Sequence, residues 1–283
     1  PLKRSYKPRV AHERALAKRK ERGRKLRLKN QAIRRYVIQK LKGGYSPEQI
    51  SGRMKLDGVG HISHEAIYQY VYARVRRNGN GAMKPGYPDL RLYLKRRHKK
   101  RAKKGMRKGE RIFKPKGIPI DERPHIVEKR RRIGDWEGDS IESKDHQPGL
   151  NSLVDRTSGL LLLSKLSAKT AKATREAVSK RLANLPAHTL TVDNGSENQE
   201  WRETEEATSA RVYFAHPYHS WERGTNENTN GLVRWYFPKG TDFRDVREED
   251  IAAVEYALNT RPRKRLGYRT PLDVFNQSVA LAG

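Results

Sequence analysis

The sequence has no cysteine among its 283 residues. This absence excludes disulfide bridges, thiolate metal sites and cysteine nucleophiles together. Long apolar runs are also absent: the richest, residues 160–163, falls far short of the roughly 20 apolar residues that a membrane-spanning helix needs. No apolar segment near the N-terminus resembles a signal peptide. We therefore expect a soluble, intracellular protein with no membrane partner, and, because the chain starts at Pro1 rather than at methionine, we expect further residues upstream.

Positive charge is in excess, and the excess is confined to one half of the chain. Residues 1–132 hold 42 Lys and Arg against 10 Asp and Glu, whereas residues 133–283 hold 20 against 22. A net charge of +32 over the first half predicts a polyanionic partner, because each Lys or Arg that neutralises a phosphate releases a condensed counterion. Nucleic acid is the favoured partner. The alternatives are an unstructured basic tail and an acidic membrane surface, but no basic amphipathic helix with a broad aromatic face supports the membrane.

Helix signals follow a basic arm at residues 1–29. Apolar residues recur at helical spacing over 31–42, and a Gly-Gly pair then ends that helix. Ser46 opens a capping-box pattern with proline at the next position, which predicts a second helix. A third is expected to start after Ser63.

The last two of these helices are joined by a glycine-containing turn, which is the order of a helix-turn-helix. We therefore predict an all-α helix-turn-helix domain over residues 30–77, whose second helix lies in the major groove of DNA. The alternative is a small helical bundle that does not touch DNA. The candidate DNA contacts are Ser63, His64, Tyr68 and Gln69.

Residues 78–124 start with a turn-rich stretch and show almost no apolar period. We expect a basic linker that follows a phosphate backbone in an extended form, the alternative being a solvated tail. Its candidate DNA contacts are Arg96, Arg97, Lys99, Lys100 and Arg101.

Residues 125–283 change to the pattern of a globular α/β domain. Three strands are expected within 134–167, and further strands at 189–193 and 211–217 alternate with helices. Three consecutive strands followed by alternation favour a mixed five-stranded sheet flanked by helices. The predicted fold class is thus multidomain, an all-α helix-turn-helix followed by an α/β domain.

Three acids are candidates for chemistry. Phosphodiester chemistry in a protein without cysteine usually needs hard metal ions held by oxygen ligands, and a pair of ions clamps both the attacking and the leaving oxygen. Asp139 lies in the first strand, Asp193 closes the fourth, and Glu227 stands in the first turn of a helix. Arg234 follows Glu227 by seven residues, two helical turns, so it shares that face and could meet DNA. Asp155, which ends the second strand, is a rival acid that more simply begins a turn.

Each of the three acids has a structural alternative. Asp193 precedes Asn-Gly and could only form a turn, and Glu227 could only interact with the helix dipole. Asp135 and Glu137 share a strand face with Asp139 by the period of two. Spacing alone does not choose among these three.

Six stretches carry a resemblance to a known family. They are YSPEQISGRMKL (45–56), ISHEAIYQYVY (62–72), IGDWEGD (133–139), LTVDNGSE (190–197), WERGTNENTNGLVRWYFPKGTDF (221–243) and LNTRPRKRLGYRTP (258–271). On them the chain resembles the DDE transposases of the insertion sequence thirty family over about residues 45–275. The run at 221–243 is the most specific, because its length and composition have no general structural explanation.

The resemblance implies a ribonuclease-H-like catalytic domain at 125–283 with the triad Asp139, Asp193 and Glu227, and it selects Asp139 over Asp135. It implies Mg²⁺ as cofactor, with Mn²⁺ able to substitute and two ions per site. It further implies binding of double-stranded DNA at inverted repeats and target, metal-dependent strand cleavage and strand transfer, a homodimer or higher assembly, and a bacterial cytoplasm at the nucleoid. Members carry a further helix-turn-helix near the N-terminus, so we expect this chain to be truncated.

Other residues of the matching stretches are predicted to contact DNA. Those flanking the glutamate are Arg223, Asn226, Asn230 and Arg234, and a phosphate-contacting run is expected at Arg263, Lys264 and Arg265. His216 and His219 could contact an attacking water, although loop histidines are usually structural.

Two other functions stay open. One is a non-catalytic DNA-binding regulator that retains an enzyme-like domain. The other is a ribonuclease-H-like nuclease that acts on RNA–DNA hybrids, against which the helix-turn-helix and the basic linker argue.

Overall fold

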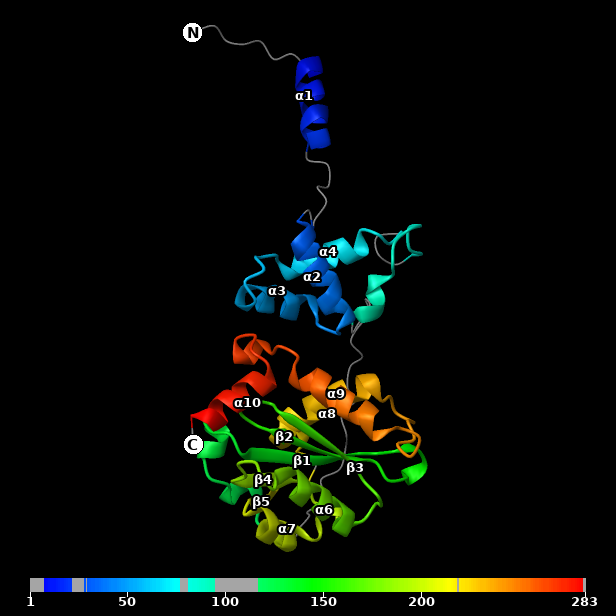
Figure 1. Ribbon diagram of the computed structural model, residues 1–283. Coiled ribbons are helices and arrows are strands. Elements are labelled where there is room, and N and C mark those ends of the chain that lie inside the picture. The colour runs from blue at the N-terminus through cyan, green and yellow to red at the C-terminus, as the bar shows by residue number, and fades with distance from the viewer. Residues whose placement is uncertain are drawn as a thin grey trace. The chain divides into compact units, whose positions relative to one another are not determined.

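The computed structural model describes residues 8–21, 28, 30–76, 81–94, 117–217 and 219–281 (Figure 1). These residues fall into two compact units, one within residues 1–101 and the other within residues 102–283. In the part of the chain so described, no helix combines the length and the apolar character needed to cross a membrane.

The first helix, α1 (Pro8–Glu21), lies where the sequence suggested only a basic arm. Its residues are mostly Ala, Arg, Lys, Glu and Leu, which have high intrinsic helix propensity. The side chains described in it are almost all exposed, so it has no apolar face for packing. The periodicity that reveals the other helices is therefore missing here.

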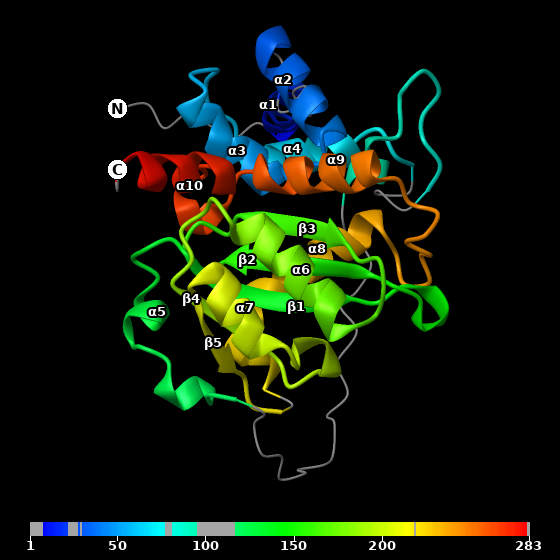
Figure 2. The same ribbon diagram turned by 60° about the horizontal axis from the view of Figure 1, so that its bottom comes forward.

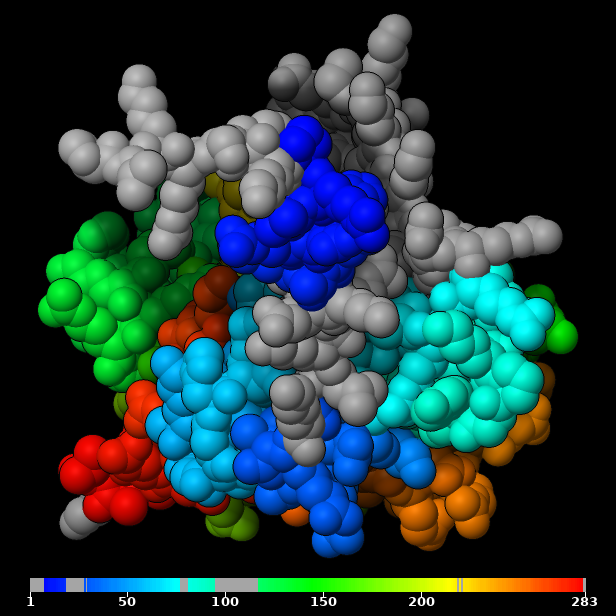
Figure 3. Space-filling view, turned by 90° about the horizontal axis from the view of Figure 1, so that it is seen from above, coloured from blue at the N-terminus to red at the C-terminus, as the bar shows by residue number. Residues whose placement is uncertain are grey.

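Three helices form the core of the N-terminal unit: α2 (Gln31–Lys42), α3 (Pro47–Leu56) and α4 (His64–Tyr72). Ser46 and Ser63 cap α3 and α4 through their hydroxyl groups, as the sequence predicts, and Ser46 forms a full capping box. Figure 3 shows the surface of this unit, with light-blue and turquoise residues on either side of the blue α2. The shared core holds Val37, Leu41, Ile50, Met54, Ile67 and Val71, each at most 1% exposed.

The predicted linker is wrong at both of its ends. Residues 81–94 belong to the helical unit, because Leu90 and Leu94, at the short helix η2 (Leu90–Tyr93), are buried in the same core. Residues 117–124 belong to the second unit, where the amide of Phe214 donates to the carbonyl of Ile118 at 2.8 Å. The predicted contacts Arg96, Arg97, Lys99, Lys100 and Arg101 lie outside the described residues.

A mixed five-stranded sheet organises the C-terminal unit, with the strand order β3-β2-β1-β4-β5. The strands are β1 (Asp135–Ile141), β2 (Leu150–Asp155), β3 (Leu161–Lys165), β4 (Thr189–Val192) and β5 (Arg211–Phe214). The first three are antiparallel, whereas β4 and β5 run parallel to β1. The predicted mixed sheet with flanking helices is confirmed.

Helices cover both faces of this sheet. Figure 2 shows α6 (Ala171–Leu182) and α7 (Trp201–Thr208) across one face, with α8 (Gly224–Tyr236) behind the sheet. The remaining helices of the unit are α5 (Ile126–Lys129), α9 (Glu248–Asn259) and α10 (Pro271–Ala280).

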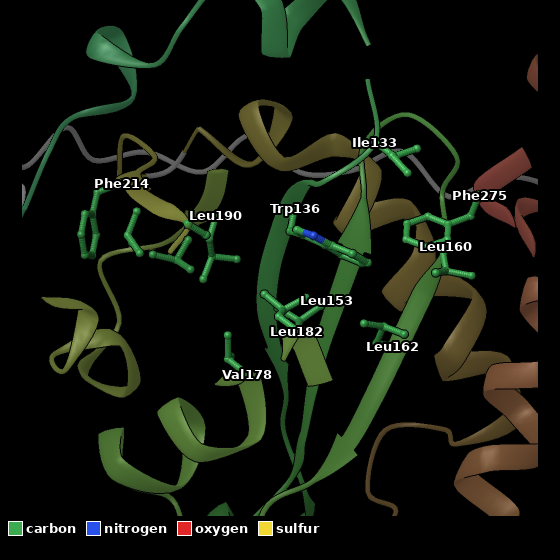
Figure 4. Packing of buried hydrophobic residues seen from close by; sticks show 13 residues of the cluster. Ile133, Trp136, Leu153, Leu160, Leu162, Val178, Leu182, Leu190, Phe214 and Phe275 are labelled. Atoms are coloured by element: carbon green, nitrogen blue, oxygen red, sulfur yellow. The ribbon is translucent and has the colours of Figure 1, made fainter. Parts of the chain in front are cut away.

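Two hydrophobic clusters result from this arrangement. Because successive side chains of a strand point to opposite faces, Leu153 joins the cluster under α6 while Val154 joins the one under α8 and α9. Trp136 lies at the centre of the first cluster, beside Phe275 of α10 (Figure 4), and its indole N–H donates to the carbonyl of Pro186 at 2.9 Å.

The N-terminal unit contains a polar link between two of its helices. The hydroxyl of Tyr36 in α2 donates to Asp57 at 2.6 Å, and Arg53 of α3 donates to the other oxygen of the same carboxylate at 2.8 Å. Partial burial raises the pKa of the Asp57 carboxyl, but these two hydrogen bonds outweigh burial and leave that pKa below its usual value.

We predict that Asp57→Asn destabilises the helical unit by about 1–2 kcal/mol at neutral pH, because a hydrogen bond to a charged group contributes about 1.5–3 kcal/mol and the partial exposure of this carboxylate reduces that contribution. A carboxyl whose pKa is depressed on folding stabilises the fold fully above its unfolded pKa, and this stabilisation is lost as the pH falls through the folded pKa. The difference in thermal midpoint between wild type and variant, followed by circular dichroism, should therefore disappear on acidification. A difference that is unchanged at acid pH would contradict the prediction.

Candidate active site

Two of the predicted acids stand at the same end of neighbouring strands. Asp135 of β1 is aligned with Thr189 of β4 in parallel register, and Glu137 is aligned with Thr191. The same register, continued by two residues, brings Asp139 opposite Asp193, which directly follows β4. Because paired strands lie about 4.8 Å apart, the fold itself brings the two carboxylates together.

A single arginine bridges these two carboxylates. One terminal nitrogen of Arg223 lies 3.2 Å from Asp139 Oδ1, and the other lies 3.1 Å from Asp193 Oδ2. The same guanidinium also donates to the carbonyl of Gly138 at 3.0 Å. Arg223 ends the short helix η6 (Ser220–Arg223), directly before α8, so the segment that carries the third acid also supplies the cation.

Glu227 is exposed in the first turn of α8. Asn230 stands three residues further on, a neighbouring position on the helix surface, and its amide donates to Asp139 Oδ2 at 2.8 Å. Glu227 therefore lies in the part of α8 whose neighbouring turn contacts Asp139.

The rival acids of β1 are buried in polar contacts of their own. Asp135 is 1% exposed, receives two hydrogen bonds from Arg132 at 2.9 Å and accepts a third from Thr189. Glu137 is fully buried and pairs with Arg156 at 2.6 Å. The Asp139 side chain, by contrast, is 26% exposed. Of the three acids on this strand face, Asp139 is the one with access to solvent.

The third rival, Asp155, forms the turn that the sequence favoured for it. It is fully buried and accepts hydrogen bonds from the amide and the hydroxyl of Ser158 at 2.6 Å, and from the amide of Gly134 at 2.9 Å.

A polar network beneath the edge fixes α8 to the sheet. The backbone amide of Asn226 donates to Glu137 at 2.8 Å, and its side-chain amide donates to the Glu137 carbonyl at 2.9 Å. The hydroxyl of Ser152 in β2 lies 3.2 Å from the Asn226 side-chain oxygen and 2.9 Å from that of Asn230. Asn226 is fully buried, so its amide holds the helix rather than facing DNA. Ser152 and Arg156 could not be singled out from the sequence, because their partners lie many residues away along the chain.

The electrostatics of the edge suit a cation. Burial raises the pKa of the Asp139 carboxyl; the positive charge of Arg223 opposes this, and the negative charge of Asp193 adds to it. Burial lowers the pKa of the Arg223 guanidinium, but the two carboxylates outweigh burial and raise it. The donor set of carboxylate oxygens is the one that Mg²⁺ prefers, and a cation already lies between two of them. The residues present therefore fit a divalent ion.

The basic residues of this unit that are predicted to contact DNA differ in how far their side chains are buried. Arg234 donates to the carbonyl of Glu142 at 2.7 Å, and burial lowers its pKa. Burial and the neighbouring arginines lower the pKa of Arg263 to about 10, and its guanidinium donates to the Leu258 carbonyl. Arg265 donates to the carbonyl of Thr157, and Lys264 is exposed.

The predicted contacts of the helical unit surround the start of α4. Ser63 caps the helix through its hydroxyl, and His64 beside it is exposed. Tyr68 packs against the core, and the Gln69 amide donates to Glu65 at 3.1 Å. Their contact with DNA stays a prediction.

Comparison with known proteins gives close relatives of one kind. No family model matches the chain. The transposase for insertion sequence element IS4351 of Bacteroides fragilis is 41% identical over 278 residues, which cover 97% of this chain and 82% of the relative. The transposase InsI for insertion sequence element IS30A of Escherichia coli is 36% identical over 89% of this chain and 66% of the relative. The transposase for element IS1086 of Cupriavidus metallidurans is 36% identical over 88% of this chain and 72% of the relative.

Among solved structures, the catalytic core domain of BIV integrase covers 53% of this chain and 97% of that domain, with a TM-score of 0.41 and 18% identity, too low to add to the fold described above.

The chain is an insertion-sequence transposase, because it is similar to these relatives over most of its length. Its basic helical unit and the acids on its mixed sheet agree with that class. The chain belongs to the IS30 family of these transposases.

Because Glu137 is buried and Asp139 is partly exposed, neutralising the two acids should change the stability by very different amounts. Glu137→Gln leaves Arg156 without its fully buried partner and should lower the free energy of unfolding by about 3–5 kcal/mol. Asp139→Asn acts on a partly exposed ion pair and should change it by at most about 1 kcal/mol. All four tryptophans, at positions 136, 201, 221 and 235, lie in the C-terminal unit, so urea unfolding followed by tryptophan fluorescence reports on this unit alone. Equal losses in the two variants would contradict the assignment.

Proposed function

We propose that this transposase is a metal-dependent polynucleotidyl transferase in which Asp139, Asp193 and Glu227 hold two Mg²⁺ ions, with Mn²⁺ able to substitute. The bridge from Asp139 through Arg223 to Asp193 carries the proposal, because it places two carboxylates from separate strands around one positive charge. The ribonuclease-H-like assignment belongs to this proposal and is supported by the strand order and the mixed strand directions.

The proposed reaction has two steps at one phosphodiester-binding edge. Water attacks the phosphodiester at the end of the element and breaks its bond to the 3′ oxygen, which leaves a 3′-hydroxyl on the element and a 5′-phosphate on the flanking DNA. That 3′-hydroxyl then attacks a phosphodiester of the target DNA, joins to its phosphate and displaces a 3′-hydroxyl of the target strand. When bound, the divalent ions polarise the phosphate and stabilise the charge that develops on the attacking and leaving oxygens. The chain's own contribution is positioning: Asn230 orients the Asp139 carboxylate through the bond to Oδ2, and the buried Glu137 fixes the start of α8.

Arg223 changes partner in this proposal. Its guanidinium neutralises the two aspartates in the structure described here. With divalent ions held by the two aspartates, the Arg223 guanidinium would be available for a bidentate contact with a DNA phosphate, which arginine makes well. The predicted DNA contact by Arg223 and its observed ion pairs are thus two states of one side chain.

The N-terminal unit is proposed to bind the inverted repeats of the element through a helix-turn-helix formed by α3 and α4. Residues 1–101 carry 30 Lys and Arg against 6 Asp and Glu, which supports a duplex DNA partner. Because two ends must be cut and joined, we propose a homodimer or higher assembly on DNA, acting in the bacterial cytoplasm.

The decisive test incubates the protein with Mg²⁺ and labelled duplexes that bear the inverted repeat, and separates the strands on a denaturing gel. We expect cleavage by the wild type. Asp139→Asn, Asp193→Asn and Glu227→Gln should each reduce it by more than about 100-fold, since removal of groups that only orient metal ligands already costs 10- to 100-fold. The matched control is Asp145→Asn, an exposed acid of the same unit, which should cut at the wild-type rate.

Three outcomes would contradict the proposal. Cleavage by the acid variants at the wild-type rate would show that the site is elsewhere. Specific binding of the repeat without cleavage under any divalent ion would instead indicate a regulator, and cleavage of RNA–DNA hybrids alone would indicate a ribonuclease.

A further inference from the structure

Three side chains capable of binding a metal ion converge in the segment between β5 and α8. Glu222 Oε1 lies 2.9 Å from His216 Nδ1 and 3.1 Å from His219 Nδ1. One ligand atom from each residue can be chosen so that all three lie within 4.8 Å of one another. The Glu222 side chain is 17% exposed and the two imidazoles are about two-fifths exposed, so the group is accessible to an ion from solvent.

The spacing of these atoms is close to that of a tetrahedral zinc site. Ligand bonds of about 2.0–2.1 Å at tetrahedral angles place neighbouring ligand atoms about 3.3 Å apart. The two nitrogen–oxygen distances observed here are shorter than that by only a few tenths of an ångström. Two histidines and one glutamate are a known zinc ligand set that leaves a fourth position for water.

Separate contacts orient both imidazole rings. Asp121 Oδ2, from a distant part of the chain, lies 3.0 Å from His216 Nε2. A carboxylate that accepts the hydrogen of one ring nitrogen leaves the other nitrogen free to bind a metal, which is the usual support of a metal-bound histidine. The ring of His219 stacks on Trp221, with centroids 4.3 Å apart and an angle of 26° between the planes.

The carboxylate is fixed as well, and the charge of the group favours a cation. Glu222 Oε2 accepts the backbone amide of His216 at 2.8 Å, which leaves Oε1 facing the two rings. The carboxylates of Glu222 and Asp121 lie beside the two nitrogens of the His216 imidazole, so negative charge is concentrated at this position.

We propose that His216, His219 and Glu222 bind one zinc-type ion, at a site separate from the carboxylates of Asp139 and Asp193. The imidazole ligands favour Zn²⁺ or a similar transition metal over Mg²⁺, which prefers oxygen ligands. The residue that follows Glu222 is Arg223, so a bound ion fixes the backbone that presents this arginine to the two aspartates. The zinc site does not depend on the proposed DNA chemistry.

The test is a calorimetric titration of the full chain with Zn²⁺ in the presence of excess Mg²⁺, which occupies the carboxylate edge. We expect the wild type to bind one Zn²⁺ per chain. The dissociation constant should be at least 100-fold larger in the double variant His216→Ala/His219→Ala and at least tenfold larger in Glu222→Gln. Substitution by Co²⁺ supplies a second readout, because a tetrahedral site with histidine ligands gives visible absorption that the variants should lose.

The matched control is His125→Ala, which removes an exposed histidine of the same unit outside the cluster and should leave zinc binding unchanged. Circular dichroism checks the fold of each variant, and His219→Asn alone replaces the double variant if the latter does not fold. Absence of zinc binding in the wild type, or equal affinity and stoichiometry in wild type and cluster variants, would overturn the proposal.

Discussion

The rest of the candidate site depends on the contacts of one buried carboxylate, that of Glu137. It has no exposure to solvent, pairs with Arg156 at the end of β2, and accepts the backbone amide of Asn226 in the first turn of α8. A buried charge of this kind is tolerated only when its oxygens are all used, and here they join two strands and a helix. Because α8 is attached to β1 at this point, the edge that carries Asp139 also carries Glu227.

The two solvent-accessible aspartates, Asp139 and Asp193, are close enough to repel each other. Two carboxylates at the ends of adjacent parallel strands repel each other, and burial of Asp139 makes its ionised form still less favourable. The positive charge of Arg223 offsets this repulsion, because its guanidinium forms ion pairs with Asp139 and Asp193. The site is therefore preorganised for a cation, and a divalent ion has to compete with a side chain supplied by the same segment that leads into α8.

Much of the fold could be predicted from the sequence, because most elements carry a periodic signal. The helix over 31–42, the caps at Ser46 and Ser63 and the positions of the five strands along the chain follow from apolar spacing and turn residues. The helix at α1 has no apolar face, and residues 81–94 contribute only isolated leucines to the core, so periodicity could not reveal either.

The candidate site was predictable only in outline. The period of two placed three acids on one face of β1, but the distinction between Glu137 and Asp139 depends on Arg156, which is brought to Glu137 by strand pairing rather than by sequence distance. Asn226 and Asn230 were predicted as DNA contacts from their place beside the glutamate, and the structure shows the first as a buried link and the second as a partner of Asp139. The catalytic roles themselves stay predictions.

Diffraction from crystals of the protein soaked in Mn²⁺, with the anomalous signal used to locate the ion, tests the central claim most directly. We predict manganese between the carboxylates of Asp139 and Asp193, with the guanidinium of Arg223 moved away from both. Manganese bound only elsewhere, with Arg223 still bridging the two aspartates, would contradict the claim that this edge is a divalent metal site.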